Sequence, residues 1–383
     1  MSASVTAIIL AAGYSSRMGT FKPLLSFGGT TVLERAIELF RAAGISDIRV
    51  VVGHRAGELL PLLERMDVRP VLNERYQDGM FSSVVAAAES LEDERGAFFL
   101  LPVDIPLVRR QTVELLLRTY QGGSTGILYP AFRGTRGHPP LLSCSYRTAI
   151  ISFDGSGGLK TLLMQYEDDS ATLECGDEGV LLDMDTPEDY ERLHSLVLRG
   201  AIPSRQVCLQ LLDMKFEADS PIVEHSHTVA RVALHLAGML NKNGCHLDLS
   251  LIEAAALLHD LAKGERDHAA AGAALLEQMG YGVVADLVAV HTDLPPHLDD
   301  GVDGADLLYL ADKLVDGSRV MSLESRFSRP LERYTHDPLV VASILRRLES
   351  ARTIQRRVET YAGCALDAIF ANFTDGVVPD TQS

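Results

Sequence analysis

A change of hydrophobic spacing near residue 200 is the feature that most limits the fold of this chain. Before it, short apolar runs typical of buried strands alternate with segments of helical spacing. The expected strands lie at 5–10, 48–52, 68–72 and 97–103, and the expected helices at 32–43, 56–66 and 82–91. This alternation predicts a mostly parallel sheet with helices on both faces, whereas helical spacing from 205 onward predicts an all-α unit. The sequence therefore predicts domains over 1–199 and 205–373, a linker over 200–204 and a flexible tail over 374–383.

The charge balance of the 383 residues limits the partners of the protein. The formal net charge is −17 and both halves are acidic, which argues against a long nucleic-acid backbone as a partner. No apolar run approaches the roughly 20 residues of a membrane span, and the N-terminus lacks the basic region of a signal peptide. Five scattered cysteines without CxxC spacing are typical of reduced thiols. These features predict a cytoplasmic protein that binds small molecules, without nucleic-acid or membrane partners.

The segment 10–22, LAAGYSSRMGTFK, directly follows the first expected strand. Gly13 and Gly19 predict a turn into a helix, and backbone N–H groups in such a turn can face a phosphate. Arg17 and Lys22 add positive charge on either side of Gly19. Neither a Walker loop nor the GxGxxG dinucleotide motif is present. The spacing leaves two interpretations open, a phosphate-binding loop or an ordinary strand–turn–helix with surface cations.

Aspartates follow two of the expected strands in this half. Asp104 comes directly after the strand at 97–103, and ligands of open α/β sheets bind beyond the carboxyl ends of the strands. Asp183 and Asp185 are two residues apart in an apparent strand, so they are expected to share a face before Pro187 begins a helix. Carboxylates at such positions suit Mg²⁺ that bridges phosphate oxygens. The alternative is that each aspartate caps a turn or lies at the surface.

Four motifs of the first half occur in the order found in the molybdopterin nucleotidyltransferases: LAAGxSxRMGxxK, PxDxP, RGHP and LDMDTPEDY. The first half resembles this family on these motifs, and Ala12, in place of a second glycine, resembles its cytidylyl branch. The resemblance implies transfer of a nucleotidyl group from an NTP, here CTP, to a phosphorylated acceptor such as molybdopterin, with release of pyrophosphate. It also implies Mg²⁺ on Asp104 and Asp185, and catalytic roles for Arg17 and Lys22.

The same resemblance implies a set of nucleotide-binding residues and shows one departure from the family. Where the family has a GDxGAR-like segment, Ser156 replaces the acid and Lys160 replaces the arginine, so the acceptor can differ from molybdopterin. A sugar or lipid phosphate is therefore an alternative acceptor, and the RGHP segment can also be a plain hairpin turn. The implied nucleotide-binding residues are Leu10, Ala11, Ala12, Gly13, Arg17, Lys22, Asn73, Ser82, Arg136 and His138.

Nine of the twelve histidines lie beyond residue 200. His259 and Asp260 end an apolar helical run, and a neighbouring imidazole and carboxylate suit a divalent metal with nitrogen and oxygen ligands. With His225 34 residues before His259 and Asp312 52 residues after Asp260, the second half resembles the HD-domain metal-dependent phosphohydrolases. The resemblance implies that these four residues bind the metal, and it favours His225 over the competing His227.

Further residues match HD subfamilies that bind two metals. His268 and His291 are candidates for a second ion that shares Asp260, with Lys263 near a substrate phosphate, although each histidine can also be structural. Mn²⁺, Fe²⁺, Mg²⁺ and Zn²⁺ all suit such ligands.

The sequence thus predicts a bifunctional enzyme, a Rossmann-like α/β nucleotidyltransferase followed by an all-α HD phosphohydrolase. In the alternative, the HD domain is a non-catalytic nucleotide or metal sensor. Self-association and a molybdoenzyme or chaperone partner are compatible with the first resemblance.

Overall fold

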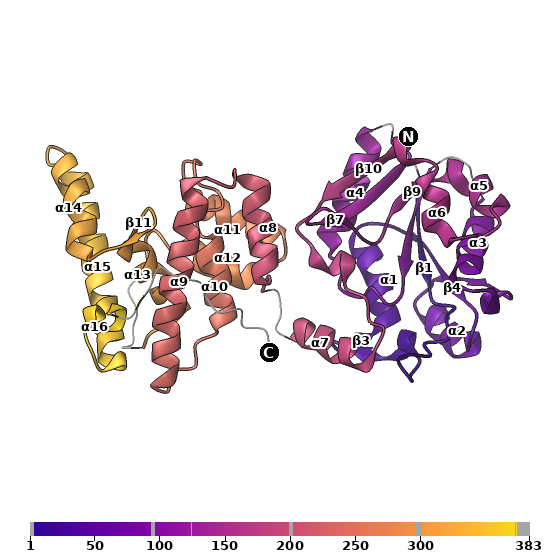
Figure 1. The fold of residues 1–383 in the computed structure, drawn as a ribbon, viewed down its shortest axis with the longest axis horizontal. Coiled ribbons are helices and arrows are strands. Elements are labelled where there is room, and N and C mark those ends of the chain that lie inside the picture. The colour runs from indigo at the N-terminus through magenta and orange to yellow at the C-terminus, as the bar shows by residue number, and fades with distance from the viewer. Residues whose placement is uncertain are drawn as a thin grey trace. The chain divides into compact units, whose positions relative to one another are not determined.

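The computed structural model describes residues 4–92, 96–123, 125–198, 202–295, 301–371 and 373. The chain divides into two units, Met1–Gly200 and Ala201–Ser383, which are drawn in Figure 1 and are described here one at a time. The tail expected at 374–383 and the first two residues of the expected linker lie outside the described residues. In the described part of the chain, no helix is long and apolar enough to cross a membrane.

An eight-stranded mixed sheet forms the centre of the first unit. The strand order is β10-β7-β9-β6-β1-β4-β5, and β8 pairs with the edge of β7. β1 runs parallel to both β4 and β6, while β9 is antiparallel to its neighbours, so the predicted mostly parallel sheet is confirmed. The strands are β1 (Val5–Leu10), β4 (Asp47–Val52), β5 (Arg69–Leu72), β6 (Ala97–Pro102), β7 (Ile127–Phe132), β8 (Thr135–Arg136), β9 (Leu141–Ser143) and β10 (Ser170–Glu174).

Helices cover both faces of this sheet, as predicted (Figure 1). Successive side chains of a strand point to opposite faces, so Ile9 and Phe99 enter one core with Phe40 of α1, while Ile8 and Phe98 enter a second core on the other face. A small hairpin, β2 (Ser26–Phe27) and β3 (Thr30–Thr31), precedes α1. The helices are α1 (Val32–Ala42), α2 (Ala56–Arg65), α3 (Met80–Ser90), α4 (Arg110–Gly122), α5 (Arg147–Ser152), α6 (Gly158–Met164) and α7 (Pro187–Leu198).

Two local predictions for this unit are wrong. The glycine segment after β1 does not turn into a helix, because Ser15 and Gly19 have φ values of 56° and 68°, which a right-handed helix excludes. It forms an irregular loop that ends in the short 3₁₀ helix η1 (Lys22–Leu24). The segment around Met184 is not a strand either. It follows the 3₁₀ helix η5 (Glu178–Leu181), and its Met184 N–H donates to the carbonyl of Asp104 at 2.9 Å.

The second unit is helical, as predicted, apart from one hairpin that the prediction missed. β11 (Val315–Asp316) and β12 (Arg319–Val320) pair across a two-residue turn in which Gly317 has a φ of 59°. Glycine at the first of the two turn positions, here in Gly317-Ser318, is a sequence signal for such a turn. The helices are α8 (Arg205–Lys215), α9 (Pro221–Lys242), α10 (Leu249–Leu258), α11 (His268–Gln278), α12 (Gly282–Val290), α13 (Gly304–Leu314), α14 (Leu323–Arg333), α15 (Pro338–Ala362) and α16 (Leu366–Phe370).

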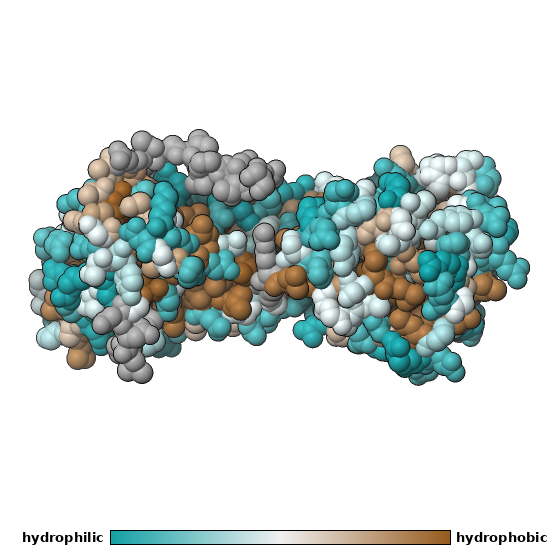
Figure 2. All heavy atoms as spheres, turned by 90° about the horizontal axis from the view of Figure 1, so that it is seen from below, coloured by the Kyte–Doolittle hydropathy of each residue, from teal (hydrophilic) through white to brown (hydrophobic). Residues whose placement is uncertain are grey.

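The apolar helix α10 is the core element of the second unit. Its residues from Ala254 to Leu258 are buried, and α9 and α13 pack against it. The chain leaves α10 directly into His259 and Asp260, which are therefore fixed deep in the unit, with exposed fractions of 0% and 3%. On the face drawn in Figure 2, apolar residues reach the surface in places among polar ones, as they do on most globular proteins.

Candidate functional sites

The loop after β1 forms one wall of a cavity of about 340 Å³ in the first unit. Leu10 ends β1 and Asp104 follows β6, and because these strands are parallel neighbours, both residues lie at the same edge of the sheet. This edge is where open α/β sheets bind ligands. The lining includes Leu10, Ala11, Ala12, Gly13, Tyr14, Ser15, Lys22, Tyr76, Gln77, Gly79, Met80, Ser83 and Asp104.

Four of the predicted residues come together beside this cavity. Lys22 Nζ lies 3.2 Å from Asp104 Oδ2 and 2.7 Å from Asp185 Oδ1, and Arg17 NH1 lies 2.9 Å from Asp185 Oδ2. Lys22 is only 7% exposed, whereas the Arg17 side chain is 73% exposed. The anchoring of Met184 to the main chain of Asp104 is what brings Asp185, 81 positions later in the chain, to this point.

Two carboxylates at one edge fit a magnesium ion, since Mg²⁺ is commonly bound by one or two protein carboxylates plus waters and substrate phosphates. Asp104 and Asp185 both direct an oxygen to Lys22 Nζ, so their negative charges converge on one place. Asp183, the weaker candidate of the sequence, is exposed. The site therefore holds two acidic and two basic groups next to a loop of main-chain N–H donors.

Asn73 and Ser82, predicted to bind the nucleotide, support the cavity wall instead of lining it. The amide of Asn73 donates to Ser82 Oγ at 2.9 Å and to Ser83 Oγ at 3.0 Å, and its oxygen accepts from the N–H of Arg75. Asn73 is 3% exposed. Of the two serines, Ser83 is the one in the cavity lining. The amide of Asn73 thus fixes the loop after β5 and the start of α3.

Arg136 also lies apart from the lining that the structure describes. Its guanidinium donates to both oxygens of Glu167, at 2.6 and 2.9 Å, and stacks 4.4 Å from the ring centroid of Tyr129. His138 is closer to the acidic groups: burial lowers its pKa, and the nearby Asp104 carboxylate opposes this shift. Its Nδ1 is buried without a hydrogen-bond partner among the described residues. The lowered pKa favours the neutral form of the His138 imidazole.

Aromatic rings that the sequence analysis did not single out flank the loop. Tyr14 is half exposed, and its ring centroid lies 4.8 Å from that of His54 and 5.5 Å from that of Tyr76. Tyr14 and Tyr76 both line the cavity. The sequence did not predict that these rings meet, because they come from three separate segments of the chain. They give the cavity a partly aromatic wall on which a flat ring can stack.

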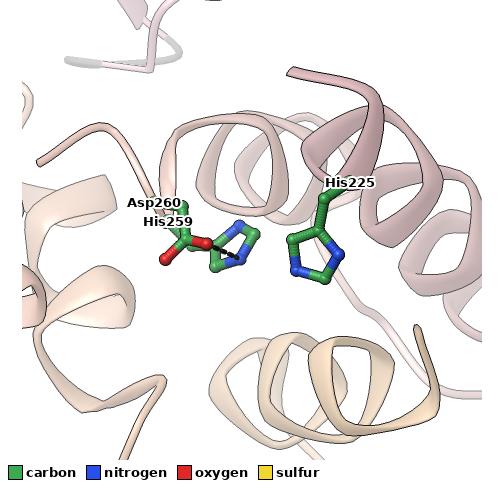
Figure 3. Close-up of side chains that lie close together, drawn as sticks. All are labelled: His225, His259 and Asp260. Carbon is green, nitrogen blue, oxygen red and sulfur yellow. Dashed lines mark ion pairs between the residues drawn. The ribbon is translucent and has the colours of Figure 1, made fainter. Parts of the chain in front are cut away.

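A second cavity, of about 430 Å³, lies in the helical unit. Two groups of candidate metal ligands meet there, His225 with His259 and Asp260, and Asp260 with His268 and His291. Within each group the ligand atoms are no more than 4.8 Å apart, and Asp260 belongs to both. In Figure 3 the ring of His225 extends from α9 toward His259 and Asp260 at the end of α10.

The hydrogen bonds of the histidines fit a metal in this cavity. Nδ1 of His259 lies 2.8 Å from the carbonyl of Ala256, and Nδ1 of His291 lies 2.7 Å from that of Val288. A carbonyl only accepts, so Nδ1 donates and, in the neutral ring, Nε2 keeps its lone pair. Nε2 of His259 is buried without a hydrogen-bond partner among the described residues, 3.6 to 3.7 Å from two carboxylates. Because the lone pair of His259 Nε2 faces carboxylate oxygens, the arrangement indicates a binding site for a cation.

His225 and Asp312 complete this arrangement. Nδ1 of His225 lies 3.1 Å from the carbonyl of Gly317, the turn residue of the missed hairpin, and Nε2 lies 3.1 Å from Asp312 Oδ1. His227, two residues along α9, is not in the cavity lining that the structure describes, and burial lowers its pKa. The structure thus brings His225, not His227, to the other candidate ligands. His297, which no sequence motif supports as a ligand, lies outside the described residues.

Two lysines neutralise the two central carboxylates. Lys263 Nζ lies 2.9 Å from Asp260 Oδ2, and Lys313 Nζ lies 2.5 Å from Asp312 Oδ2. Burial opposes ionisation of both acids, yet the neighbouring histidines and lysines hold the pKa of Asp260 and of Asp312 below the ordinary value. Both carboxylates are therefore ionised at neutral pH, which is the form that binds a metal.

Metal binding to this cluster is expected to weaken as the pH falls. Burial alone would lower the pKa of His259, but the Asp312 and Asp260 carboxylates raise it overall, so a proton competes for Nε2. Each proton released on binding changes the metal affinity by about tenfold per pH unit. Calorimetric titration with Mn²⁺ between about pH 5 and about pH 8 measures this slope. We expect His227→Ala to keep the wild-type slope, and a pH-independent affinity would contradict the expectation.

The fold and the two sites define the class of protein: an α/β domain with a cavity of about 340 Å³ beside paired carboxylates, then a helical domain with a histidine–aspartate cluster. Comparison with known proteins agrees. Residues 7–170 match the MobA-like NTP transferase domain, and residues 222–319 match the HD domain. The chain belongs to the MobA-like NTP transferase family, and an HD domain follows its transferase domain.

Curated relatives match the first half of the chain. A molybdenum cofactor cytidylyltransferase of Escherichia coli (strain K12) is 28% identical over 188 residues, which are 49% of this chain and 94% of that protein. A nicotine blue oxidoreductase of Paenarthrobacter nicotinovorans is 30% identical over 196 residues, 49% of this chain and 96% of that protein. Among solved structures, a nucleotidyl transferase from Methanothermobacter thermautotroptrophicus is 25% identical with a TM-score of 0.45, and the match covers 51% of this chain and 98% of that one.

Proposed function

We propose that the first domain transfers a nucleotidyl group from CTP to a phosphorylated acceptor and releases pyrophosphate. The observation that carries this proposal is the convergence of Asp104, Asp185, Lys22 and Arg17 beside the loop after β1. In such a reaction an oxygen of the acceptor attacks the α-phosphorus while the bond to the pyrophosphate oxygen breaks. Two anions must approach each other, so catalysis depends on positioning and charge neutralisation.

The residues of the site have different roles in this reaction. The loop N–H groups and Gly13, which lacks a side chain, let the phosphates approach the main chain closely. Lys22 and the exposed Arg17 offset the growing negative charge of the leaving pyrophosphate. When Mg²⁺ is bound by Asp104 and Asp185, it supplies charge neutralisation and orients the phosphate oxygens. Tyr14 and Tyr76 give a flat surface on which a ring of the nucleotide or the acceptor stacks.

We propose molybdopterin as the acceptor and CTP as the donor. Ala12 supports the cytidylyl branch, and so does the likeness to a protein named molybdenum cofactor cytidylyltransferase. One feature favours a different acceptor, such as a sugar or lipid phosphate: Ser156 and Lys160 replace the acid and the arginine of the family segment before α6. Another relative of similar identity is named an oxidoreductase, which is a different reaction class. The reaction must therefore be tested directly.

Nucleotide binding by the first domain is the experiment that tests this proposal. We expect thermal unfolding of the whole chain to shift upward with CTP and Mg²⁺, by about 2.7 kcal/mol of added stability at a hundredfold excess over Kd. Asp104→Ala should abolish the shift, whereas Asp168→Ala, an exposed carboxylate of the same domain, should keep it. A larger shift with GTP would overturn the assignment of CTP. The absence of a shift with CTP, GTP, ATP and UTP would contradict nucleotide binding itself.

For the second domain we propose metal-dependent hydrolysis of a phosphate ester. Water attacks the phosphorus, the P–O ester bond breaks, and inorganic phosphate and an alcohol leave. Asp260 shared by two ligand groups supports a site for two divalent ions, which would activate the water and hold the phosphate. Lys263 lines the same cavity, which supports a contact between its ammonium group and a phosphate oxygen.

We also propose a domain boundary and a cellular location, each on a single observation. We place the boundary between the catalytic domains at 200–204, next to the division of the chain into two units. A cytoplasmic location is supported by five cysteines that form no disulfide, two of them buried. The rival function of the second domain is a nucleotide or metal sensor that regulates the transferase. It would keep the metal cluster but lack turnover, and the replacement of Asp260 distinguishes the two functions.

A further inference from the structure

Two arginines belong to the wall of the 430 Å³ cavity without belonging to either group of candidate metal ligands. Arg326 comes from α14 and Arg347 from α15. The metal-binding side of the cavity is built from residues of α9 to α13 and their ends. The arginines therefore belong to a separate wall, and they need an explanation besides metal binding.

The ion pairs of both guanidinium groups are long. Arg326 Nε donates to the carbonyl of Val315 at 3.2 Å, which fixes the guanidinium, and its NH1 lies 3.7 Å from Asp316. Arg347 NH2 lies 3.5 Å from Asp293, and its Nε is buried without a hydrogen-bond partner among the described residues. Charge-assisted hydrogen bonds are usually about 2.7–2.9 Å long. Both arginines thus retain hydrogen-bonding capacity for a ligand.

Positive charge is in excess on this side of the cavity. Asp293 is shared, because Arg346 lies 3.7 Å and Arg347 3.5 Å from the same oxygen. Lys263 and Lys313 are not counted in this excess, since each is already paired with an aspartate of the metal cluster. Divalent ions in the cluster would add to the positive charge. In a chain with a net charge of −17, such a local excess indicates an anionic ligand.

The same wall also offers apolar surface. Phe327 and Pro330 of α14 and Ile344 of α15 line the cavity beside the two arginines. A cavity of about 430 Å³ is large enough for more than a single phosphate ion and lies in the range of small-molecule sites. A ligand that fills it has an organic part, for which these three side chains provide contacts.

We propose that Arg326 and Arg347 bind a second anionic group of the substrate, while the metal cluster binds the phosphate that is cleaved. The substrate is then an organic phosphate with two anionic groups, such as a bisphosphate, whose carbon skeleton packs on the apolar wall. Guanidinium groups suit this role because they donate two parallel hydrogen bonds to a phosphate or carboxylate. The proposal rests on the phosphohydrolase function proposed above. The arginines determine specificity and take no part in bond cleavage.

Kinetics with matched substrates test this role on the whole chain loaded with Mn²⁺. The substrates are 4-nitrophenyl phosphate, adenosine 5′-monophosphate and adenosine 3′,5′-bisphosphate. We expect KM to be lowest for the bisphosphate, and Arg326→Gln and Arg347→Gln each to raise that KM about tenfold or more. Neither variant should change KM for 4-nitrophenyl phosphate. Arg329→Gln is the matched control, because Arg329 is exposed on α14 and is not in the described lining.

Equal KM values for the mono- and bisphosphate, or equal changes for all substrates in the arginine variants, would overturn the proposal. Calorimetric binding of the bisphosphate separates this failure from failure of the proposed hydrolysis. If the wild type binds the bisphosphate without turnover and the arginine variants bind it more weakly, hydrolysis is refuted and second-anion recognition stands. If the wild type does not bind the bisphosphate, the recognition itself is refuted.

Discussion

Replacing Asp260 by alanine is expected to lower phosphatase turnover roughly a thousandfold or more. Asp260 is the residue common to both groups of candidate ligands, so its loss removes a ligand from each metal position. A metal ion contributes several kcal/mol to stabilisation of the transition state, and each 1.36 kcal/mol changes the rate by about tenfold. The measurement is release of inorganic phosphate with Mn²⁺, Fe²⁺, Mg²⁺ or Zn²⁺, together with the metal content of the purified protein.

Controls distinguish loss of the metal from unfolding of the Asp260→Ala variant. Asp260 is 3% exposed and pairs with Lys263, so thermal unfolding of the variant is measured alongside activity. Asp286→Ala removes an exposed carboxylate of the neighbouring helix α12 and should behave as wild type. If Asp260→Ala leaves phosphatase turnover unchanged, the hydrolase function is wrong. If it changes only the nucleotide affinity of the transferase, the second domain is a sensor.

Replacing Lys22 by methionine is expected to lower nucleotidyl transfer about 100- to 1,000-fold, the range found when one donor to a transition-state charge is removed. Methionine keeps most of the length of the side chain but removes the charge that lies between Asp104 and Asp185. Without it, Asp104 loses this cationic partner and only Arg17 still pairs with Asp185, so the two carboxylates repel each other and the phosphates more strongly. Pyrophosphate release with CTP, Mg²⁺ and the acceptor measures the effect.

A matched variant shows whether the position or only the net charge matters. Arg118→Met removes one positive charge from the exposed side of α4, away from the described cavity lining, and should leave the rate unchanged. We expect Mg²⁺ to restore part of the binding of CTP to Lys22→Met, because the ion neutralises the same carboxylates. Full activity of Lys22→Met would show that the cation has no part in the reaction.

The sequence singled out the candidate ligands of the second domain from short-range signals, and the structure brings these residues together in one cavity. His259 and Asp260 end a strongly apolar helix, and that helix is buried for reasons that its own composition determines. The same holds for Asp104 at the end of the all-apolar strand β6. A polar residue at the end of a buried element is held at the edge of the core, where a site can form.

Residues whose position depends on distant contacts were not predicted. Tyr14, His54 and Tyr76 meet although they come from separate loops, and Arg326 and Arg347 reach the metal cavity from helices that carry no motif. Asn73 and Arg136, expected at the nucleotide, are instead bound by side chains of the protein itself. Spacing along the chain cannot reveal which of several polar residues finds a partner within the fold.

The sequence by itself determined the two fold classes, four strands and three helices of the first unit, and the polar residues Asp104, His259 and Asp260 at the ends of apolar elements. These follow from hydrophobic periodicity, which is a local property. The tertiary structure alone decided that Lys22 lies between Asp104 and Asp185, that His259 and His291 turn Nε2 toward Asp260, and that the loop after β1 is not helical. These side-chain and loop conformations depend on charges and main-chain carbonyls that packing brings together, so they form only in the folded chain.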